Sequence, residues 1–133
     1  MSKNELLLNN VLNEIYLMQK GVRDCVLVDD VPCSDPNELI KTLFTIEQMA
    51  TKSGFRVVVN HVEDPDPSNE FCEVYIYKYN YQRLIINIIL EDKKIDKFLK
   101  EYLLGTLLGY SAQSMEEFIM KNVTLALIDK TNK

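Results

Sequence analysis

The sequence predicts an α+β fold, in which a small antiparallel sheet packs against amphipathic helices and the C-terminal half of the chain is helical. Two observations predict this class. Short runs at 25–28, 55–62 and 71–79 are rich in β-branched and aromatic residues, as strands are. The stretches between and after them repeat apolar residues at helical spacing. No repeat, linker or break in composition divides the 133 residues, so a single domain over 1–133 is expected.

The first helix is predicted at the start of the chain. Ser2 followed by Glu5 is a capping-box pattern, which places the first helical residue at Lys3. Gly21 suits the position just after the last helical turn. Between them the apolar residues recur at helical spacing: Leu8, Val11, Leu12, Ile15 and Met18.

A strand and a second helix follow. The run 25–28 is short and apolar, and Asp29 with Asp30 is expected to close it as a buried strand. Asp35 then precedes Pro36, which is the order of a helix cap and a first-turn proline, and Glu38 completes a capping box. The helix is expected to end at the glycine in position 54, and its apolar positions are Leu39, Ile40, Leu43, Phe44, Ile46 and Met49.

The second and third strands are predicted to form a hairpin. The segment 63–70 between them contains two prolines and four acidic residues, which is the composition of a loop. A loop this short favours antiparallel pairing of 55–62 with 71–79.

The segment 81–90 fits either a helix or a fourth strand. Its isoleucine-rich composition suits a strand, whereas the absence of flanking turn residues favours a helix. A helical pattern then covers 93–108 and ends at Gly109. A last helix is expected to start near Ser111, with Met115, Phe118 and Ile119 on one face.

The composition predicts a cytoplasmic protein. No apolar run approaches about 18 residues, so no membrane partner is expected. The N-terminus carries an acidic residue before its leucines and no small-residue cleavage site, which argues against a secretory signal. Three widely spaced cysteines do not form a secreted disulfide scaffold. Cys25 and Cys72 lie in apolar runs, where a reduced thiol behaves as a small, buried and inert hydrophobe.

The charge balance argues against a nucleic-acid partner. The net charge of −5 opposes neutralisation of phosphates. The only dense basic stretch, 93–100, has mixed charges at helical spacing, which is typical of a solvated helix face. The acidic excess instead favours solubility and a basic partner.

Enzyme motifs are largely absent. None of the four glycines forms a phosphate-binding loop, and neither G-x-S-x-G nor H-E-x-x-H occurs. With one histidine, His61, most nucleophilic and zinc mechanisms have too few partners. We therefore expect no catalytic residue, no metal ligand and no cofactor.

An acidic metal site is the alternative hypothesis. Asp29 and Asp30 at a strand end, with Asp64 and His61 near the hairpin loop, would suit a metal-assisted hydrolase or a nucleotide-processing enzyme if they converged. The spacing of a calcium-binding loop is missing, and solvated turns explain the aspartates without a ligand.

The third strand carries the most unusual pattern. Because side chains alternate across a sheet, one of its faces is aromatic and consists of Phe71, Glu73, Tyr75, Tyr77 and Tyr79. If helices cover this face, the tyrosines belong to the core. If the face is open, it is a binding surface, since tyrosine is enriched in interface hot spots. Base stacking is a third use, but the strand lacks the basic neighbours of RNA-binding sheets. These five residues are the predicted binding site.

The C-terminal helices offer a further contact. Gly105 and Gly109 are four residues apart, which allows a neighbouring helix to approach closely. The spacing predicts either helix packing within the chain or a helix stop, and the alternative is a homodimer through Tyr102, Leu103, Leu107 and Tyr110.

The preferred function is a small acidic interaction protein, a non-enzymatic regulator or inhibitor that binds a protein partner. Immunity factors and phage-encoded inhibitors act in this way. Abundant Lys, Asn and Ile with scarce Gly, Pro and Trp are typical of proteins from AT-rich bacterial or phage genomes.

Overall fold

In the computed structural model the chain divides into two compact units, Met1–Arg83 and Leu84–Lys133. The described residues are 3–91, 96–109, 113–114, 116–117, 120–121 and 124. Most of the expected last helix, including Ser111, Met115, Phe118 and Ile119, lies outside them. The expectation of one domain over 1–133 stays a prediction, and the two units are described separately.

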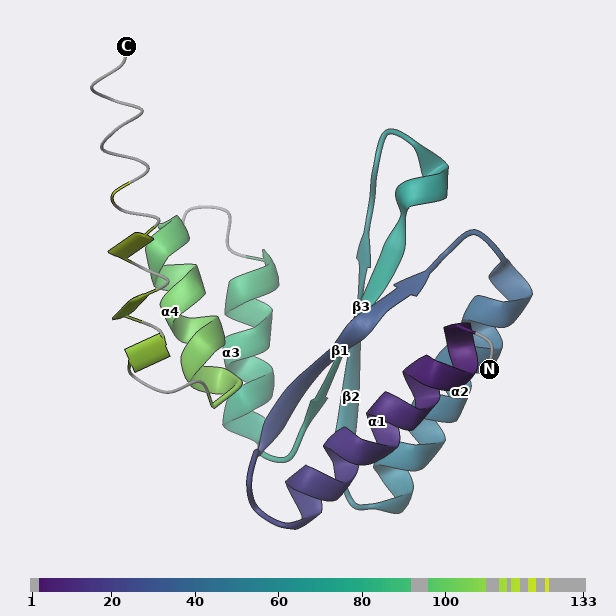
Figure 1. Cartoon of the computed structure of the whole chain (residues 1–133), viewed down its shortest axis with the longest axis horizontal. Helices are drawn as coiled ribbons and strands as arrows, with labels where there is room; N and C mark the ends of the chain where they lie inside the picture. Colours follow the sequence, from purple (N-terminus) through teal and green to yellow (C-terminus); the bar gives the residue numbers. More distant parts are fainter. Residues whose placement is uncertain are drawn as a thin grey trace. The chain divides into compact units, whose positions relative to one another are not determined.

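The first unit is a three-stranded antiparallel sheet with two helices on one face (Figure 1). The strand order is β1-β3-β2, so β3 lies in the centre. This arrangement confirms the α+β class, the antiparallel hairpin, and the helices predicted before and after the first strand in the sequence. In chain order the elements are α1 (Lys3–Gln19), β1 (Cys25–Pro32), α2 (Pro36–Lys52), β2 (Arg56–Val62), the 3₁₀ turn η1 (Pro67–Asn69), β3 (Phe71–Tyr77) and the start of α3 (Asn80–Glu91).

The two helices that pack on the sheet, α1 and α2, contact each other at their N-terminal ends. Asp35 caps α2 by accepting hydrogen bonds from the backbone N–H groups of Asn37 (3.1 Å) and Glu38 (3.3 Å), as its sequence position predicts. The Glu38 carboxylate accepts a hydrogen bond from Asn4 Nδ2 of α1 at 3.0 Å. The start of α1 and the start of α2 are therefore neighbours, with α1 over β1 and α2 over β2.

The core of this unit lies between the helices and the sheet. Cys72, Val74 and Ile76 alternate along β3 and point toward the helices, so each is almost fully buried. Burial of a large aliphatic side chain stabilises a fold by roughly 1.5–3 kcal/mol. The other members of this core are Leu7, Val11, Ile15, Met18, Val26, Val28, Val31, Ile46, Ala50 and Phe55.

The first strand is longer than its sequence predicts. Asp29 and Asp30 were expected to close it, but β1 continues through them to Pro32. A β-bulge between Val28 and Val31 shifts the pairing with β3, so that both carboxylates stay exposed while Val31 returns to the core with 1% exposure. The prediction that the aspartates end the strand was wrong, because a bulge accommodates polar residues without ending the pairing.

The segment 81–90 belongs to α3, so its prediction as a helix is confirmed and the described sheet has three strands rather than four. The second unit holds the remainder of α3 and the helix α4 (Lys97–Leu107). Asp96 caps α4 by accepting the backbone N–H of Phe98 at 2.8 Å. Gly109 follows α4 with a φ of 76°, a conformation that suits a glycine after a helix.

Replacing Ile76 with alanine is expected to lower the free energy of unfolding by about 2–5 kcal/mol, because its side chain is fully buried at the centre of the sheet. Urea denaturation measures the change. The matched control is Val59→Ala on β2, where the side chain is 45% exposed and the cost should stay below about 1 kcal/mol. Equal losses for the two variants would contradict the assigned core.

Candidate functional site

The predicted tyrosine face is accessible only in part. Tyr75 and Tyr77 are 2% and 5% exposed, whereas Phe71 and Glu73 are half-buried. The third strand was predicted to run to Tyr79, but β3 ends at Tyr77 because the backbone turns there into α3. Tyr79 therefore lies in that turn and is 43% exposed. The side chains available to a partner are therefore those at the two ends of the stripe.

The middle of the stripe is buried, which changes the acidity of Tyr75. Burial raises the pKa of Tyr75 above its ordinary value, and the nearby negative charge of Glu73 raises it further. The Glu73 carboxylate also accepts a hydrogen bond from Asn60 Nδ2 of β2 at 3.2 Å. Tyr75 is therefore a buried side chain in the described structure and is not available to a partner.

An exposed pair of tyrosines lies directly after β3. The rings of Tyr79 and Tyr81 stack with centroids 5.8 Å apart and an interplanar angle of 14°. The ammonium group of Lys78 lies 5.2 Å from the centroid of the Tyr79 ring, within the range of a cation–π contact. Tyr81 is 55% exposed, so both rings present surface to solvent.

The backbone beneath this pair is held by Gln82. Its side-chain oxygen accepts hydrogen bonds from the backbone N–H of Lys78 (2.9 Å) and of Tyr79 (2.8 Å), and the side chain is only 2% exposed. Arg56 of β2 adds a hydrogen bond from its Nη1 to Asn80 Oδ1 at 3.0 Å. The turn from β3 into α3 is thus a fixed platform for the two rings.

The sequence interpretation missed Tyr81 and Gln82 as site residues. The available signal was the glutamine three residues after Tyr79, which is half of a capping box. In that pattern the third helical residue reaches back to the N–H of the capping residue, as Gln82 does here.

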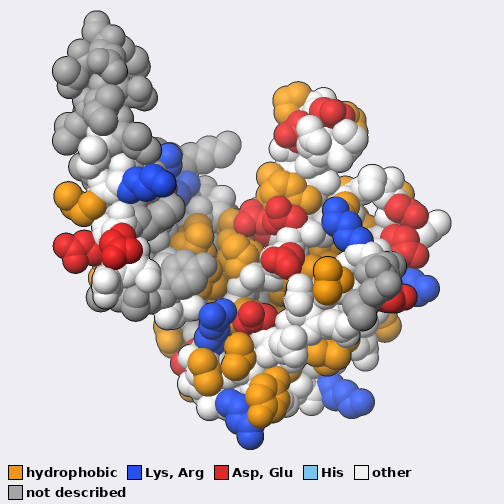
Figure 2. All heavy atoms as spheres, in the orientation of Figure 1, with side chains coloured by type: hydrophobic (Ala, Val, Ile, Leu, Met, Phe, Trp, Pro, Cys, Tyr) orange, Lys and Arg blue, Asp and Glu red, His pale blue; other side chains and the backbone are white. Residues whose placement is uncertain are grey.

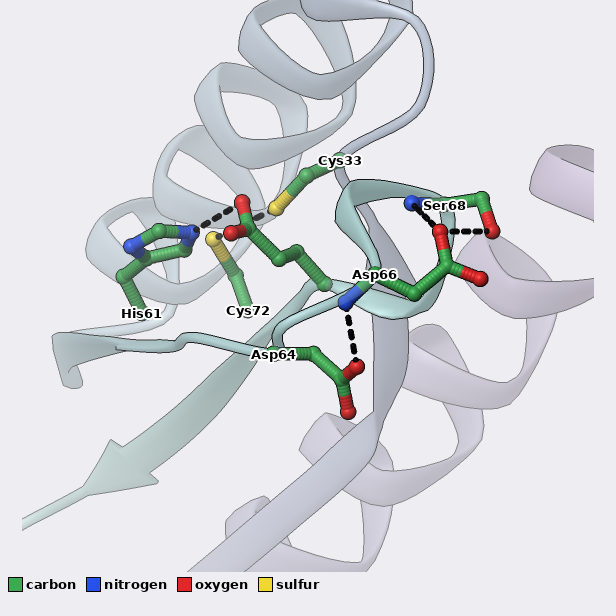
Figure 3. A network of polar contacts seen from close by, with 7 residues as sticks. Cys33, His61, Asp64, Asp66, Ser68 and Cys72 are labelled. Atoms are coloured by element: carbon green, nitrogen blue, oxygen red, sulfur yellow. Dashed lines mark hydrogen bonds and ion pairs between the residues drawn. The ribbon is translucent and has the colours of Figure 1, made fainter.

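The acidic loop between β2 and β3 is internally ordered. Asp64 Oδ1 accepts the backbone N–H of Asp66 at 2.9 Å, and Asp66 Oδ1 accepts both the N–H (3.0 Å) and the hydroxyl (2.8 Å) of Ser68 (Figure 3). These bonds lower the pKa of Asp66 below its ordinary value. Figure 2 shows acidic side chains in red at the tip of this hairpin, which stands out from the rest of the first unit.

The residues of the alternative metal site are dispersed. His61 Nε2 lies 3.3 Å from a carboxylate oxygen of Glu70. Asp29 lies in the bulge of β1, where one of its oxygens accepts a hydrogen bond from Asn10 of α1 at 3.4 Å. Asp64 is engaged in the hairpin tip. Among the residues that the structure describes, no group of three or more His, Cys, Asp or Glu side chains is placed to hold a metal ion.

A second exposed apolar surface lies on α2. Ile40 and Phe44 are 66% and 60% exposed. An α-helix turns about 100° per residue, so Ile40 and Phe44 lie roughly opposite Glu38 around α2. Because Glu38 contacts Asn4 of α1, the two apolar side chains lie on the side of α2 away from α1. Val59 of the edge strand β2 is also exposed. In the sequence, Ile40 and Phe44 are apolar helix positions like their buried neighbours, and their spacing alone does not distinguish them.

The partner predictions for the C-terminal helices stay predictions. Tyr102 of α4 is 53% exposed and Leu107 is buried, while Tyr110 and the basic residues at 93 and 94 lie outside the described part of the chain. Within that described part, none of the helices combines the length and the apolarity needed to cross a bilayer. Comparisons with protein-family models and with curated protein sequences found no match for this chain.

Replacing Gln82 with alanine is expected to lower the free energy of unfolding by about 1–3 kcal/mol, because two backbone N–H groups lose their acceptor. Thermal or urea denaturation measures the loss. Gln19→Ala at the exposed end of α1 is the matched control and should change stability by no more than about 0.5 kcal/mol. If both variants are equally stable, Gln82 does not hold the turn.

Alkaline pH is expected to destabilise the protein. The pKa of the Cys25 thiol is raised from 9.0 to about 12, mainly by burial, and that of Tyr75 is raised above 10.0. Both groups keep their protons in the folded state at a pH where the unfolded chain releases them, so their contribution to stability is complete below pH 9 and declines above it. The urea midpoint should therefore fall from pH 9 upward.

Phenolate absorbance measures the contribution of Tyr75 to this pH dependence separately from that of Cys25. In Tyr75→Phe the reversible titration of the folded protein should match that of the wild type, and only the absorbance step that accompanies alkaline unfolding should shrink. A smaller reversible titration in this variant would show that Tyr75 is accessible.

Proposed function

We propose that this chain is a small acidic binding protein, a non-enzymatic regulator or inhibitor of a protein partner, and that Tyr79 and Tyr81 form the centre of its binding surface. The observation that carries the proposal is the stacked, exposed tyrosine pair on a turn fixed by a buried glutamine.

The physical properties of this pair suit a binding hot spot. A tyrosine offers a large contact area and a polar hydroxyl with few rotatable bonds, and aromatic anchors carry much of the energy in protein interfaces. Because the two rings already stack on each other and Gln82 holds the backbone, little conformational entropy remains to be lost on binding. The pair extends the tyrosine stripe that the sequence analysis singled out, at its accessible end.

Charge supports a protein partner over nucleic acid. The net charge of −5 disfavours approach to phosphates and favours encounter with a basic surface. The ordered acidic hairpin tip gives such a surface a fixed set of carboxylates to meet. A metal-assisted enzyme that uses Asp29, Asp30, Asp64 and His61 is the alternative, and the dispersal of these side chains lends it no support.

The test begins with capture of a partner by the tagged protein from a bacterial lysate, identification by mass spectrometry, and purification of that partner. The dissociation constant is then measured for the wild type and for the double variant Tyr79→Ala/Tyr81→Ala. Loss of two hot-spot side chains, at about 2 kcal/mol each, is expected to weaken binding by several hundredfold, or roughly 4 kcal/mol.

The double variant Ile40→Ala/Phe44→Ala is the matched control, since it also removes two large exposed side chains from the first unit. It should bind within about threefold of the wild type, which corresponds to well under 1 kcal/mol. The reverse pattern would assign binding to α2. If neither variant binds more weakly, or if no partner is captured, the proposed surface is wrong.

A further inference from the structure

Two cysteines far apart in sequence meet at one end of the sheet. The sulfur atoms of Cys33 and Cys72 lie 3.8 Å apart, although the residues are separated by 39 positions (Figure 3). Both thiols are free. The contact is therefore a product of the fold and not of local sequence.

The backbone fixes this contact. The ladder between β1 and β3 ends with the pair Pro32 and Phe71, and the backbone N–H of Cys33 extends it by donating to the carbonyl of Glu70 at 3.1 Å. Cys72 lies two residues after Glu70, so its side chain points to the same face of the sheet as that of Cys33. A diagonal pair of this kind is within side-chain reach.

The two thiols differ in their access to solvent. Cys72 is 5% exposed and belongs to the helix-covered core, and burial followed by its contact with Cys33 raises its pKa to about 11. Cys33 is half-buried, directly after the strand and before the exposed Ser34. A small oxidant thus reaches Cys33 first and finds a second thiol behind it, which is the arrangement of a redox-responsive pair.

We propose that Cys33 and Cys72 form a reversible oxidation site, at which hydrogen peroxide converts the two thiols into an intramolecular disulfide. The sulfur of Cys33 attacks one peroxide oxygen, the O–O bond breaks, and Cys33 becomes a sulfenic acid while the other oxygen takes the Cys33 thiol proton and leaves as water. The sulfur of Cys72 then attacks the sulfenic sulfur, an S–S bond forms, and the hydroxyl leaves with the Cys72 proton as a second water. The two thiols supply the two electrons that reduce the peroxide, and a small dithiol reverses the reaction.

Disulfide formation requires a local rearrangement at the end of β1. Closing a sulfur–sulfur contact of 3.8 Å to a bond of about 2.05 Å requires movement of Cys33, which stands at the end of its strand and leads into a loop. Cys25 does not compete, because it is fully buried, its pKa is raised to about 12, and it pairs with Tyr77 at the other end of the sheet.

The disulfide would tie the end of β1 to the start of β3. Cys33 is followed by Ser34 and by Asp35, the cap of α2, so oxidation also restrains the entry into that helix. Ser34 and Asp35 line a cleft of about 440 Å³, together with residues of α1, α2 and the hairpin loop. The shape of this cleft is what the oxidation state would alter.

In the test, the reduced, folded protein is treated with hydrogen peroxide. Its free thiols are then counted, and its linked peptides are mapped by mass spectrometry. Free thiols should fall from three to one, with the protein monomeric, lighter by two hydrogen atoms and linked between Cys33 and Cys72. In the unfolded protein in urea, the shorter loop favours a link between Cys25 and Cys33 instead. A dithiol should restore all three thiols.

Two variants separate the steps. Cys33→Ser should keep its two thiols at the same peroxide dose. Cys72→Ser should accumulate a sulfenic acid at Cys33 that a cyclic dione reagent traps. The proposal is overturned if the folded protein loses thiols without a peptide linked between Cys33 and Cys72. It is equally overturned if the folded and the unfolded protein give the same distribution of links, or if Cys33→Ser is oxidised as fast as the wild type.

Discussion

The pairing of β3 with a strand on each side is the constraint on which the first unit depends. Its side chains alternate between a helix-covered core and a second face, so one short segment contributes to both. The features with chemical interest lie at its two ends. Cys72 meets Cys33 near its start, and the backbone leaves the sheet after Tyr77 to form the turn of the tyrosine pair. A central strand with neighbours on both edges cannot shift register without losing both ladders, which fixes these side chains in place.

Local sequence patterns were sufficient for most of the elements. The cap at Asp35 and the helical segment 81–90 follow from residues close together in the sequence, and the hairpin follows from two adjacent strands and the short loop between them. The bulge in β1 could not be predicted in this way, because two successive aspartates resemble a strand end and only the pairing with β3 shows that the strand continues. Alternation likewise assigns the tyrosines to one face but does not determine whether that face is covered. The burial of Tyr75 and Tyr77 therefore required the structure.

The residues of the candidate site also differ in whether a local sequence pattern indicates them. Tyr79 was predicted as the last residue of the strand face, but β3 ends at Tyr77 and Tyr79 lies in the turn that follows, so alternation did not determine its position. Gln82 matches half of a capping box, which is a local pattern. The contact between Cys33 and Cys72 had no local signal, since it joins the two ends of a 39-residue separation. Long-range contacts of this kind depend on strand order, and the order β1-β3-β2 places the strand latest in the sequence in the middle of the sheet.

Amide hydrogen exchange, resolved by residue, tests the central role of β3 most directly. The amides of Val74 and Ile76 are expected to exchange only through global unfolding, and those of Lys78 and Tyr79 are expected to be protected by Gln82. Amides that point outward from the edge strand β2 should exchange much faster. Exchange of the β3 amides at the rate of that open edge would contradict the account, since it would mean that the sheet opens without unfolding the unit.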